Sequence, residues 1–360
     1  MSVTALKLNF LILLFTISIF GNASDIKQDE DVIIFTTNAV HNNDARVWNI
    51  NIHGWIYEPE EDSIWRSTLI GRLIKSLDLD DQVVGSEIFK RRMRMFLVDS
   101  ESNKQLKINI MNDTMESSKT ESDGHFYVSI DVNEDDIPKD DKFSPVFIQM
   151  PINDDRKFSG LVQLVPESGV SVISDIDDTV KDSNVLDKKS LLKNTFTKPF
   201  NVVAGMEKVY QQWADEGAIF HYVSSSPWQL YPSLNDFFVK AGLPNGSFHL
   251  KMFRLMDSSI LNVFSSPMKN KLPAITEIIR TYPKRKFILV GDSGEKDPEV
   301  YAEIYRENSN QIAHIFIRNI TNENKVSERY ERTFAGIENN KWTIFDNPTE
   351  LDNFNLNNTE

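Results

Sequence analysis

Residues 169–180 read Gly-Val-Ser-Val-Ile-Ser-Asp-Ile-Asp-Asp-Thr-Val, a short β-branched apolar run that ends abruptly in carboxylates and a threonine. Such a run is typical of a central strand in a parallel sheet, because both faces of that strand are covered. Ligands of parallel sheets bind just beyond the carboxyl ends of the strands. We therefore expect Asp175, Asp177 and Thr179 to project into a crevice at that edge.

The closely spaced carboxylates allow two interpretations. Asp175 and Asp177 form an oxygen-rich site that suits Mg²⁺, which prefers one or two carboxylates together with phosphate oxygens. The alternative is an Asp-rich turn without a function, since Asp favours turns. The spacing Asp-x-Asp-x-Thr after an apolar strand resembles the first motif of the haloacid dehalogenase superfamily, and matching residues downstream would decide between the two.

The pattern over residues 166–345 alternates strand and helix, which is typical of a parallel α/β sheet. Strands are predicted at 170–174, 218–223, 287–290 and 312–317. Apolar residues at helical spacing predict helices around 206–213, 234–241 and 272–279, and Pro298 opens another at its favoured first position. Residues 346–360 are rich in Asn, and we expect a disordered tail there.

The pattern over residues 46–165 predicts a β-rich, sandwich-like accessory domain. Turn signals separate strands predicted at 47–57, 94–98, 107–110, 126–130 and 146–150, and one helix is expected around 69–77. Residues 24–45 are polar and acidic, so we expect a flexible N-terminus. This part shows no catalytic constellation.

The first 23 residues predict a signal peptide. Lys7 precedes an apolar run from Phe10 to Phe20, and small residues follow at 21–23. That run is too short for a spanning helix, which needs about 20 residues, although an uncleaved anchor is the alternative. We therefore expect a secreted or secretory-pathway protein with no transmembrane segment in the mature chain. Glycosylation acceptor triplets begin at Asn112, Asn245, Asn319 and Asn357.

Composition limits the classes of partner. The 360 residues carry 53 acidic and 39 basic side chains, for a formal net charge of −14. This excess of negative charge speaks against nucleic acid as a partner, because the phosphate backbone repels it. Cys is absent, so no disulfide stabilises the fold. The sequence does not predict an oligomeric state.

Polar residues follow the later strands as they follow the first. A Ser-Ser-Ser run (224–226) ends the second predicted strand, and Asp292 ends the strand at 287–290. Lys271 opens the helix before that strand, and Asp297 follows in a Gly-Asp-x-x-x-x-Asp arrangement. The haloacid dehalogenase motifs are an Asp pair, a Ser or Thr after a strand, a Lys and a late acidic pair, so order and placement agree.

Phosphoryl transfer needs an in-line nucleophile and neutralisation of charge on the phosphoryl oxygens. In this scheme Asp175 attacks phosphorus and forms an aspartyl-phosphate, and Asp177 protonates the leaving oxygen and later activates water. Lys271 stabilises the developing negative charge. A serine donates to a phosphoryl oxygen, and Asp175, the Asp177 carbonyl, Asp292 and Asp297 are the candidate Mg²⁺ ligands.

Several assignments stay open on physical grounds. Ser224 cannot be separated from Ser225 and Ser226, and Lys271 competes with Lys269. Asp297 precedes Pro298 and could simply cap the helix that begins there.

Three long segments then resemble the actin-patch phosphatidate phosphatase family, namely 169–181, 220–232 and 286–301, with Asn194-Thr195-Phe196 also similar. The similarity spans about residues 160–320 and is fainter around His53-Gly54-Trp55. It implies a Rossmann-like, haloacid dehalogenase-type domain that removes phosphate from phosphatidate with Mg²⁺, yielding diacylglycerol. It also implies that Ser224 and Lys271 are the family's Ser and Lys.

Two departures from the family affect the expected role. Its best-known members are cytoplasmic and work with endocytic and actin machinery, whereas this chain is expected to enter the secretory pathway. It also lacks an extended Pro-rich tail. The spacing between motifs leaves room only for a small flap at 243–268, which suits a headgroup presented at a bilayer. The alternatives are a phosphatase of soluble or protein phosphomonoesters and a non-catalytic lumenal binding module.

Overall fold

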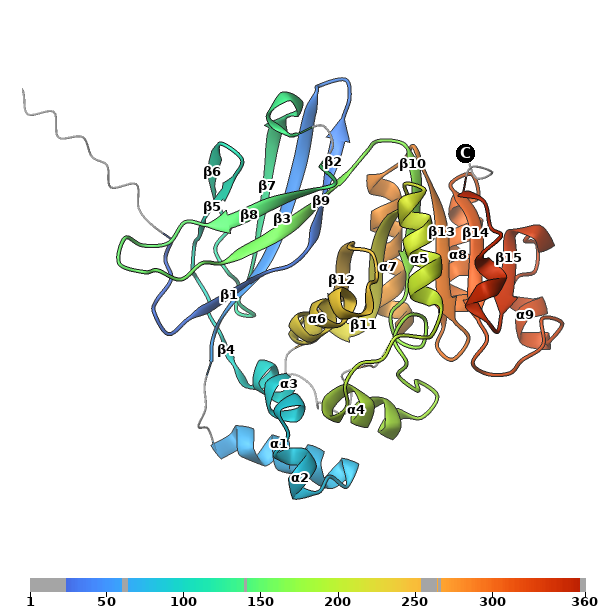
Figure 1. The fold of residues 1–360 in the computed structure, drawn as a ribbon, viewed down its shortest axis with the longest axis horizontal. Helices are drawn as coiled ribbons and strands as arrows, with labels where there is room; N and C mark the ends of the chain where they lie inside the picture. The colour runs from blue at the N-terminus through green and yellow to red at the C-terminus, as the bar shows by residue number, and fades with distance from the viewer. Residues whose placement is uncertain (1–23, 60–63, 139–140, 254–263, 265–266, 357–360) are drawn as a thin grey trace, which may run out of the picture.

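The computed structural model describes residues 24–59, 64–138, 141–253, 264 and 267–356. The chain forms an N-terminal part around a mainly antiparallel sheet and a second part around a parallel sheet (Figure 1). The predicted signal peptide, and residues 254–263, 265 and 266 of the predicted flap, lie outside the described residues.

The second part is built on a parallel sheet, as predicted. Its strands have the order β12-β11-β10-β13-β14-β15 in the described chain. They are β10 (Gly169–Ser174), β11 (Ile219–Pro227), β12 (Ser247–Lys251), β13 (Arg285–Asp292), β14 (Ile312–Arg318) and β15 (Trp342–Phe345). Strands β10 and β13 lie side by side in the middle, so the ends that carry Asp175 and Asp292 are neighbours.

Helices cover both faces of this sheet (Figure 1). They are α4 (Lys188–Thr197), α5 (Met206–Asp215), α6 (Tyr231–Ala241), α7 (Pro267–Thr281), α8 (Asp297–Asn308) and α9 (Glu328–Thr333). Alternate residues of one strand face opposite sides: Val172 packs with α5 and α6, whereas Ile173 packs with α7 and α8. The near-continuous apolar strands therefore reflect burial on both faces, as the sequence indicated.

The N-terminal part forms one hydrogen-bonded sheet among the described residues rather than two separate sheets. Its central strand, β3, pairs with β1, β2, β4 and β7, and the order continues from β2 through β9, β8 and β5 to β6. Segment 117–118 returns to β7, where the Ser118 N–H donates to the Tyr127 carbonyl at 2.9 Å. The strands are β1 (Asp31–Ile34), β2 (Thr37–Asn42), β3 (Val47–Glu58), β4 (Asp99–Ser100), β5 (Lys107–Ile110), β6 (Asp113–Glu116), β7 (His125–Asn133), β8 (Phe143–Ile148) and β9 (Ser159–Val165).

Two predictions for the N-terminal part are wrong. Residues 24–45 are not a flexible terminus, because β1 and β2 belong to the sheet and Phe35 is fully buried. The strand predicted at 94–98 falls mostly in a helix, α3 (Glu87–Leu97), which follows α1 (Ile64–Leu77) and α2 (Asp81–Val84). The Ser86 side chain caps α3, and Phe89, Met93 and Phe96 bury one helical face.

The predicted disordered tail is ordered as far as Leu356. Strand β15 leads into a short 3₁₀ turn (Pro348–Leu351) whose N-terminus Asn347 and Glu350 close with a capping box. Leu351 and Leu356 are buried in the larger core cluster. The Asn-rich composition was misleading, because these few apolar residues suffice to anchor the segment.

The two parts are packed together as well as joined. Strand β9 ends at Val165 and β10 begins at Gly169, and the buried Arg285 side chain donates to the carbonyls of Pro166 and Val170 across this junction. Phe35 packs against Trp228 with the rings tilted and their centroids 4.1 Å apart, and the Thr36 N–H donates to the Tyr231 hydroxyl at 3.0 Å.

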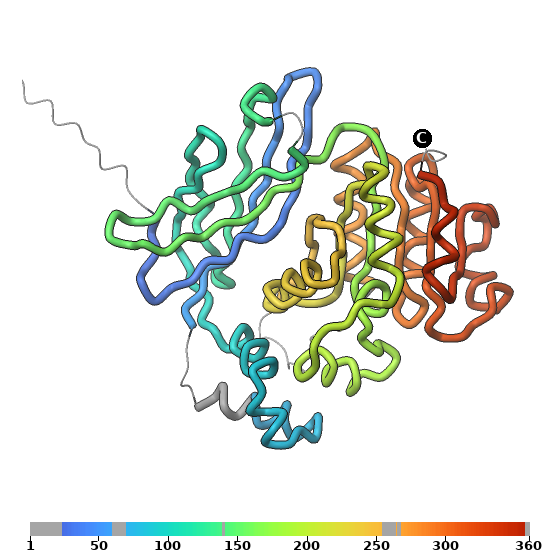
Figure 2. The backbone as a smooth tube through the Cα atoms, viewed as in Figure 1, coloured from blue at the N-terminus to red at the C-terminus, as the bar shows by residue number. Residues whose placement is uncertain are grey.

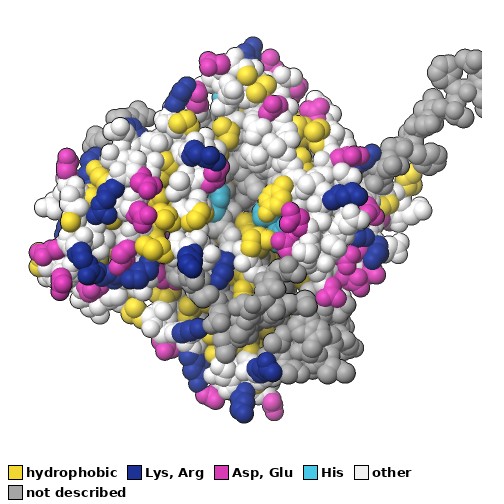
Figure 3. Space-filling model, turned by 180° about the vertical axis from the view of Figure 1, so that it is seen from behind, with side chains coloured by type: hydrophobic (Ala, Val, Ile, Leu, Met, Phe, Trp, Pro, Cys, Tyr) yellow, Lys and Arg dark blue, Asp and Glu magenta, His cyan; other side chains and the backbone are white. Residues whose placement is uncertain are grey.

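A cavity and a contact between helices also lie where the two parts meet. A cavity of about 210 Å³ lined by His53, Trp228 and His249 lies at the junction, and histidine side chains are visible in the hollow near the centre of Figure 3. Figure 2 shows the helical segment of the N-terminal part, in cyan, extending toward α4 of the second part. Within the residues that the structure covers, no helix combines the length and the apolar character that a bilayer-spanning segment requires.

Candidate active site

Asp175 lies immediately beyond the carboxyl end of β10. Its backbone N–H donates to the Val290 carbonyl of β13 at 2.9 Å, so the sheet pairing fixes its position. The Thr179 hydroxyl donates to Asp175 Oδ2 at 3.1 Å. The side chain is 1% exposed, and this buried carboxylate is therefore held by the strand and by the turn that follows.

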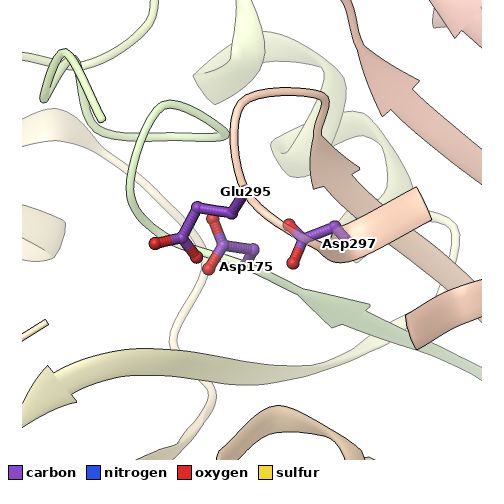
Figure 4. Close-up of side chains that lie close together, drawn as sticks. All are labelled: Asp175, Glu295 and Asp297. Carbon is purple, nitrogen blue, oxygen red and sulfur yellow. The ribbon is translucent and has the colours of Figure 1, made fainter. Parts of the chain in front are cut away.

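Lys271 places one ammonium group among three carboxylates. Its Nζ lies 2.7 Å from Asp175 Oδ1, 2.8 Å from Glu295 Oε2 and 2.5 Å from Asp297 Oδ1. Figure 4 shows these three carboxylates facing one another from the end of β10, the loop after β13 and the start of α8. Lys269, the alternative considered from the sequence, is exposed.

The charge state of Lys271 follows from these contacts. Burial acts to lower the pKa of Lys271, but Asp175, Asp297 and Glu295 outweigh it and hold that pKa well above its ordinary value. Burial raises the pKa of Asp175 well above its usual range. Lys271 opposes this shift, while Asp297 and Glu295 add to it. One ammonium thus faces an excess of carboxylates.

Asp292 ends β13 in the same cluster. Its Oδ1 accepts the backbone N–H groups of Gly294 at 2.6 Å and Glu295 at 3.2 Å. Its Oδ2 is buried and has no hydrogen-bond partner among the described residues. Burial, with the charges of Asp297 and Asp175, raises the pKa of Asp292 well above its ordinary value.

The unpartnered oxygen of Asp292 fits a divalent cation, because a buried carboxylate oxygen without a donor is costly unless a cation compensates it. Oxygens of Asp175, Glu295 and Asp297 also lie within 4.8 Å of one another, a spacing compatible with a metal ion. The Lys271 ammonium already contacts all three of those residues, however. A cation held between Asp175 and Asp292 is therefore compatible with the contacts that Lys271 makes to the other carboxylates.

Asp297 holds Lys271 and Asp292 in place. Its Oδ1 contacts Lys271, and its Oδ2 accepts the Asp292 N–H at 3.1 Å. No side-chain cap hydrogen bond is formed at the start of α8, so the cap alternative does not describe this carboxylate. A Cβ on Gly291 would lie 2.4 Å from Asp297 Oδ2, which explains the glycine at that position. Both oxygens of Asp297 are engaged, and its role as a metal ligand stays a prediction.

Asp177 lies two residues after Asp175 in a different environment. Lys181 Nζ is 2.6 Å from its Oδ1, and the Ser183 hydroxyl donates to the same oxygen at 2.8 Å. The hydroxyls of Ser226 and Ser224 donate to Oδ2 at 3.0 Å and 3.3 Å. Burial acts to raise the pKa of Asp177, but Lys181 and the hydroxyl donors outweigh it and hold that pKa below its usual value.

The loop after β10 is shaped by Asp178. This residue has φ +54°, in the left-handed region that Asp tolerates better than most residues. Its carboxylate accepts the backbone N–H groups of Ser183, Asn184 and Val185 at 2.7, 2.9 and 2.5 Å. Three such bonds fix the loop and place Lys181 and Ser183 beside Asp177.

The structure thus brings together every site residue that the sequence predicted: Asp175, Asp177, Ser224, Lys271, Asp292 and Asp297. It also adds Lys181, Ser183 and Glu295, which sequence reasoning missed. Lys181 directly follows the first motif and Glu295 lies between the two late acids, so proximity in sequence was the available signal. The choice among the serines stays open, because both Ser224 and Ser226 reach Asp177.

Comparisons with known proteins match the region that carries this site. Residues 170–319 match a family model described as the catalytic domain of phosphatidate phosphatase APP1. The phosphatidate phosphatase APP1 of Saccharomyces cerevisiae is 36% identical over 158 residues, which cover 43% of this chain and 26% of that protein. An uncharacterized protein of Schizosaccharomyces pombe is 32% identical over 190 residues, covering 51% of this chain and 31% of that protein. The chain therefore spans less than a third of the length of these relatives.

Proposed function

We propose that this protein is a Mg²⁺-dependent phosphatidate phosphatase, because residues 170–319 match the family model of the phosphatidate phosphatase APP1 catalytic domain. It releases phosphate from phosphatidate and leaves diacylglycerol, using a haloacid dehalogenase-type site. The observation that carries the proposal is the contact of Lys271 Nζ with Asp175 Oδ1 at 2.7 Å. It joins residues 96 positions apart in the sequence, in the order of the haloacid dehalogenase motifs.

The reaction takes place in two displacements on phosphorus. In the first, an Asp175 carboxylate oxygen attacks phosphorus, the phosphoester bond breaks, and Asp177 gives a proton to the departing alcohol oxygen. In the second, Asp177 takes a proton from water, the water oxygen attacks phosphorus, and the bond to Asp175 breaks. Phosphate leaves, and both carboxylates return to their starting forms.

The environment of Asp177 suits its role as the proton acceptor of the second displacement. Asp177 accepts up to three hydroxyl donors and one ammonium, which fix the direction of its oxygens. This arrangement favours its ionised, proton-accepting form, so Asp177 has to take up a proton before the first displacement. Lys271 stabilises negative charge beside the attacking group, where an ammonium in a dry site acts strongly.

Mg²⁺ would be held by Asp175, Asp292 and the backbone carbonyl of Asp177. When bound, it supplies positive charge that offsets the carboxylates and the phosphate oxygens. The unpartnered Oδ2 of Asp292 supports this assignment. Asp297 contributes by holding Asp292 and Lys271 in position.

Phosphate release from phosphatidate vesicles tests the proposal. The wild-type protein should release phosphate with Mg²⁺ and lose that activity with EDTA, and Asp175→Asn should be inactive because the amide is a poor nucleophile. Asp182→Asn, which changes an exposed carboxylate in the same loop, is the matched control and should stay active. Equal rates for Asp175→Asn and the wild type would rule the mechanism out. Soluble phosphomonoesters and phosphoproteins in parallel would show whether phosphatidate is the preferred substrate.

We also propose that residues 1–23 direct the chain into the secretory pathway. The acceptor residues Asn112 and Asn245 are exposed and can take glycans. A mobility shift on glycosidase treatment of the expressed protein, lost in Asn112→Gln and Asn245→Gln together, would support this route. A protein recovered without glycans and with an intact N-terminus would contradict it.

A further inference from the structure

Arg92 connects the N-terminal part to the wall of the active site. It lies on α3, outside residues 170–319 that the family model matches, and it is 3% exposed. Its guanidinium donates to the carbonyls of Thr195 and of Lys198, the latter at 2.7 Å. These carbonyls belong to the last turn of α4 and the residue after it, where a helix leaves carbonyls without intrahelical partners.

The guanidinium also covers an aromatic ring that contacts the site. The Arg92 guanidinium carbon lies 3.6 Å from the centroid of the Phe200 ring. The Lys181 ammonium, which holds Asp177, lies 4.7 Å from the same centroid. Phe200 therefore contacts both cations, and its position depends on the one supplied by α3.

Backbone pairing links the Phe200 segment to the catalytic loop. The Asp182 N–H donates to the Asn201 carbonyl and the Val203 N–H to the Val180 carbonyl, each at 2.9 Å. The Asn194 side chain of α4 donates to the Ser183 carbonyl at 3.0 Å. A shift of the α4 end would therefore move the loop that carries Lys181 and Ser183, the two partners of Asp177 Oδ1.

We propose that Arg92 is a positioning residue for Asp177, acting through Phe200 and Lys181, and that α3 of the N-terminal part thereby completes the active site. The inference rests on the proposed function, because it assigns Arg92 to the proton transfers of Asp177. An Arg suits the position since its planar fork can reach two carbonyls and stack on a ring at once, which Lys cannot do.

The test compares substrates that differ in their need for a proton donor. A soluble short-chain phosphatidate has an alkoxide leaving group and depends on protonation, whereas p-nitrophenyl phosphate has a good leaving group and depends on it little. kcat/KM reports the steps up to the first irreversible one, which includes release of the alcohol. We expect Arg92→Met to lower kcat/KM for the short-chain phosphatidate on the order of 10- to 100-fold, and for p-nitrophenyl phosphate much less.

Matched variants separate positioning from folding. Arg94→Met removes an exposed cation from the same helix and should change neither substrate. Arg92→Lys should fall between Arg92→Met and the wild type for the short-chain phosphatidate. If Arg92→Met does not fold, Phe200→Leu together with Arg92→Lys carries the same comparison, with melting temperature measured for each variant.

Two outcomes would overturn the inference. Equal losses for both substrates would mean that Arg92 only stabilises the fold, and no loss for either would mean that Asp177 does not depend on it. A wild-type protein inactive on every phosphomonoester would instead refute the proposed function, and this inference with it.

Discussion

Asp175 and Asp177 belong to the same strand end, yet the regions around them differ in their balance of charge. On the Asp175 side one ammonium, Lys271, faces the buried carboxylates of Asp175, Asp292 and Asp297 and the partly buried carboxylate of Glu295. On the Asp177 side one ammonium, Lys181, faces one carboxylate, and hydroxyl groups complete the shell. The first region has an excess of negative charge, and the second is balanced.

This difference indicates a division of labour. A buried surplus of carboxylates is unfavourable on its own and becomes favourable when a cation binds. A carboxylate paired with one ammonium and several hydroxyls is already satisfied and keeps a fixed direction. The Asp175 side is therefore suited to bind a metal and an anionic phosphoryl group, and the Asp177 side to move protons without being displaced by either.

The largest expected effect comes from Lys271→Met. The Asp175 side would lose its cation, and we expect activity to fall on the order of 10³-fold, as when a transition-state charge stabiliser is removed. Lys269→Met, which changes the exposed lysine two positions earlier, is the control and should be fully active. Vesicle and soluble-substrate assays of both variants make the comparison; equal activity would mean that the buried ammonium has no role in the reaction.

Lys181→Met should have a smaller effect, on the order of 10²-fold, because Ser183, Ser224 and Ser226 still orient Asp177 after the ammonium is lost. The exposed Lys198→Met is the control. If Lys181→Met lowered activity as much as Lys271→Met, the balanced region would be as sensitive as the surplus region and the contrast between them would fail.

Asp292→Asn tests directly whether the excess of carboxylates around Asp175 binds the metal ion. Mg²⁺ at about one hundred times its Kd should stabilise the wild-type protein by about 2.7 kcal/mol. The variant should lose most of this stabilisation, which is measured as the rise in melting temperature on addition of Mg²⁺. Without Mg²⁺ the variant should be at least as stable as the wild type, because one of the buried carboxylates becomes neutral. Asp182→Asn should keep the full response, and a full response in Asp292→Asn would place the metal elsewhere.

The pH dependence of Mg²⁺ binding should separate the two regions with the smallest effect. Burial raises the pKa of Asp175 and of Asp292 well above the ordinary value, so in the folded protein these groups take up protons at a higher pH than ordinary carboxylates do. Mg²⁺ must displace those protons, and its affinity should fall about tenfold per pH unit for each proton displaced.

The same shifts predict how Asp175 and Asp292 contribute to stability without Mg²⁺ as the pH changes. The raised pKa values of Asp175 and Asp292 add to the free energy of unfolding as the pH falls, because these groups bind protons in the folded protein at a higher pH than in the unfolded chain. His53, His221 and His249 act in the opposite direction, because burial lowers their pKa values. The pKa of Asp177 lies below its usual value, so its contribution should be lost only at lower pH. Calorimetry in two buffers measures the proton release, and denaturation of the wild type and of Asp292→Asn at several pH values isolates the contribution of the buried carboxylate. Binding without proton release would contradict the assigned shifts.

The parallel sheet was predictable because its sequence signals are local. Each central strand is an apolar run that leads into a candidate site residue, as at Asp175 and Asp292. The sheet topology then brings those strand ends together. Alternating strand and helix predicted the parallel sheet for the same reason. Which lysine enters the site was a tertiary question, since Lys269 and Lys271 differ only in the face of α7 on which they lie.

The missed features depend on partners far away in the sequence. Met93, Phe96 and their neighbours are compatible with strand or helix, and contacts with Phe196 and Phe253 accompany the helical packing of α3. The terminal segments appeared too polar to be ordered, but β3 supplies pairing partners for β1 and β2. The role of Arg92 gave no signal in the sequence, because the carbonyls that it binds lie more than 100 residues later.

The packing of Phe35 against Trp228 has a practical consequence for the design of shorter fragments of this protein. A fragment that began at residue 170 would keep the residues that match the family model. It would lose α3 and Phe35, and the rings of Trp228 and Tyr231 that Phe35 covers would be exposed to water. We expect such a fragment to aggregate through its exposed apolar surface. The segment that matches the family model, residues 170–319, is thus shorter than the smallest fragment that we expect to stay soluble.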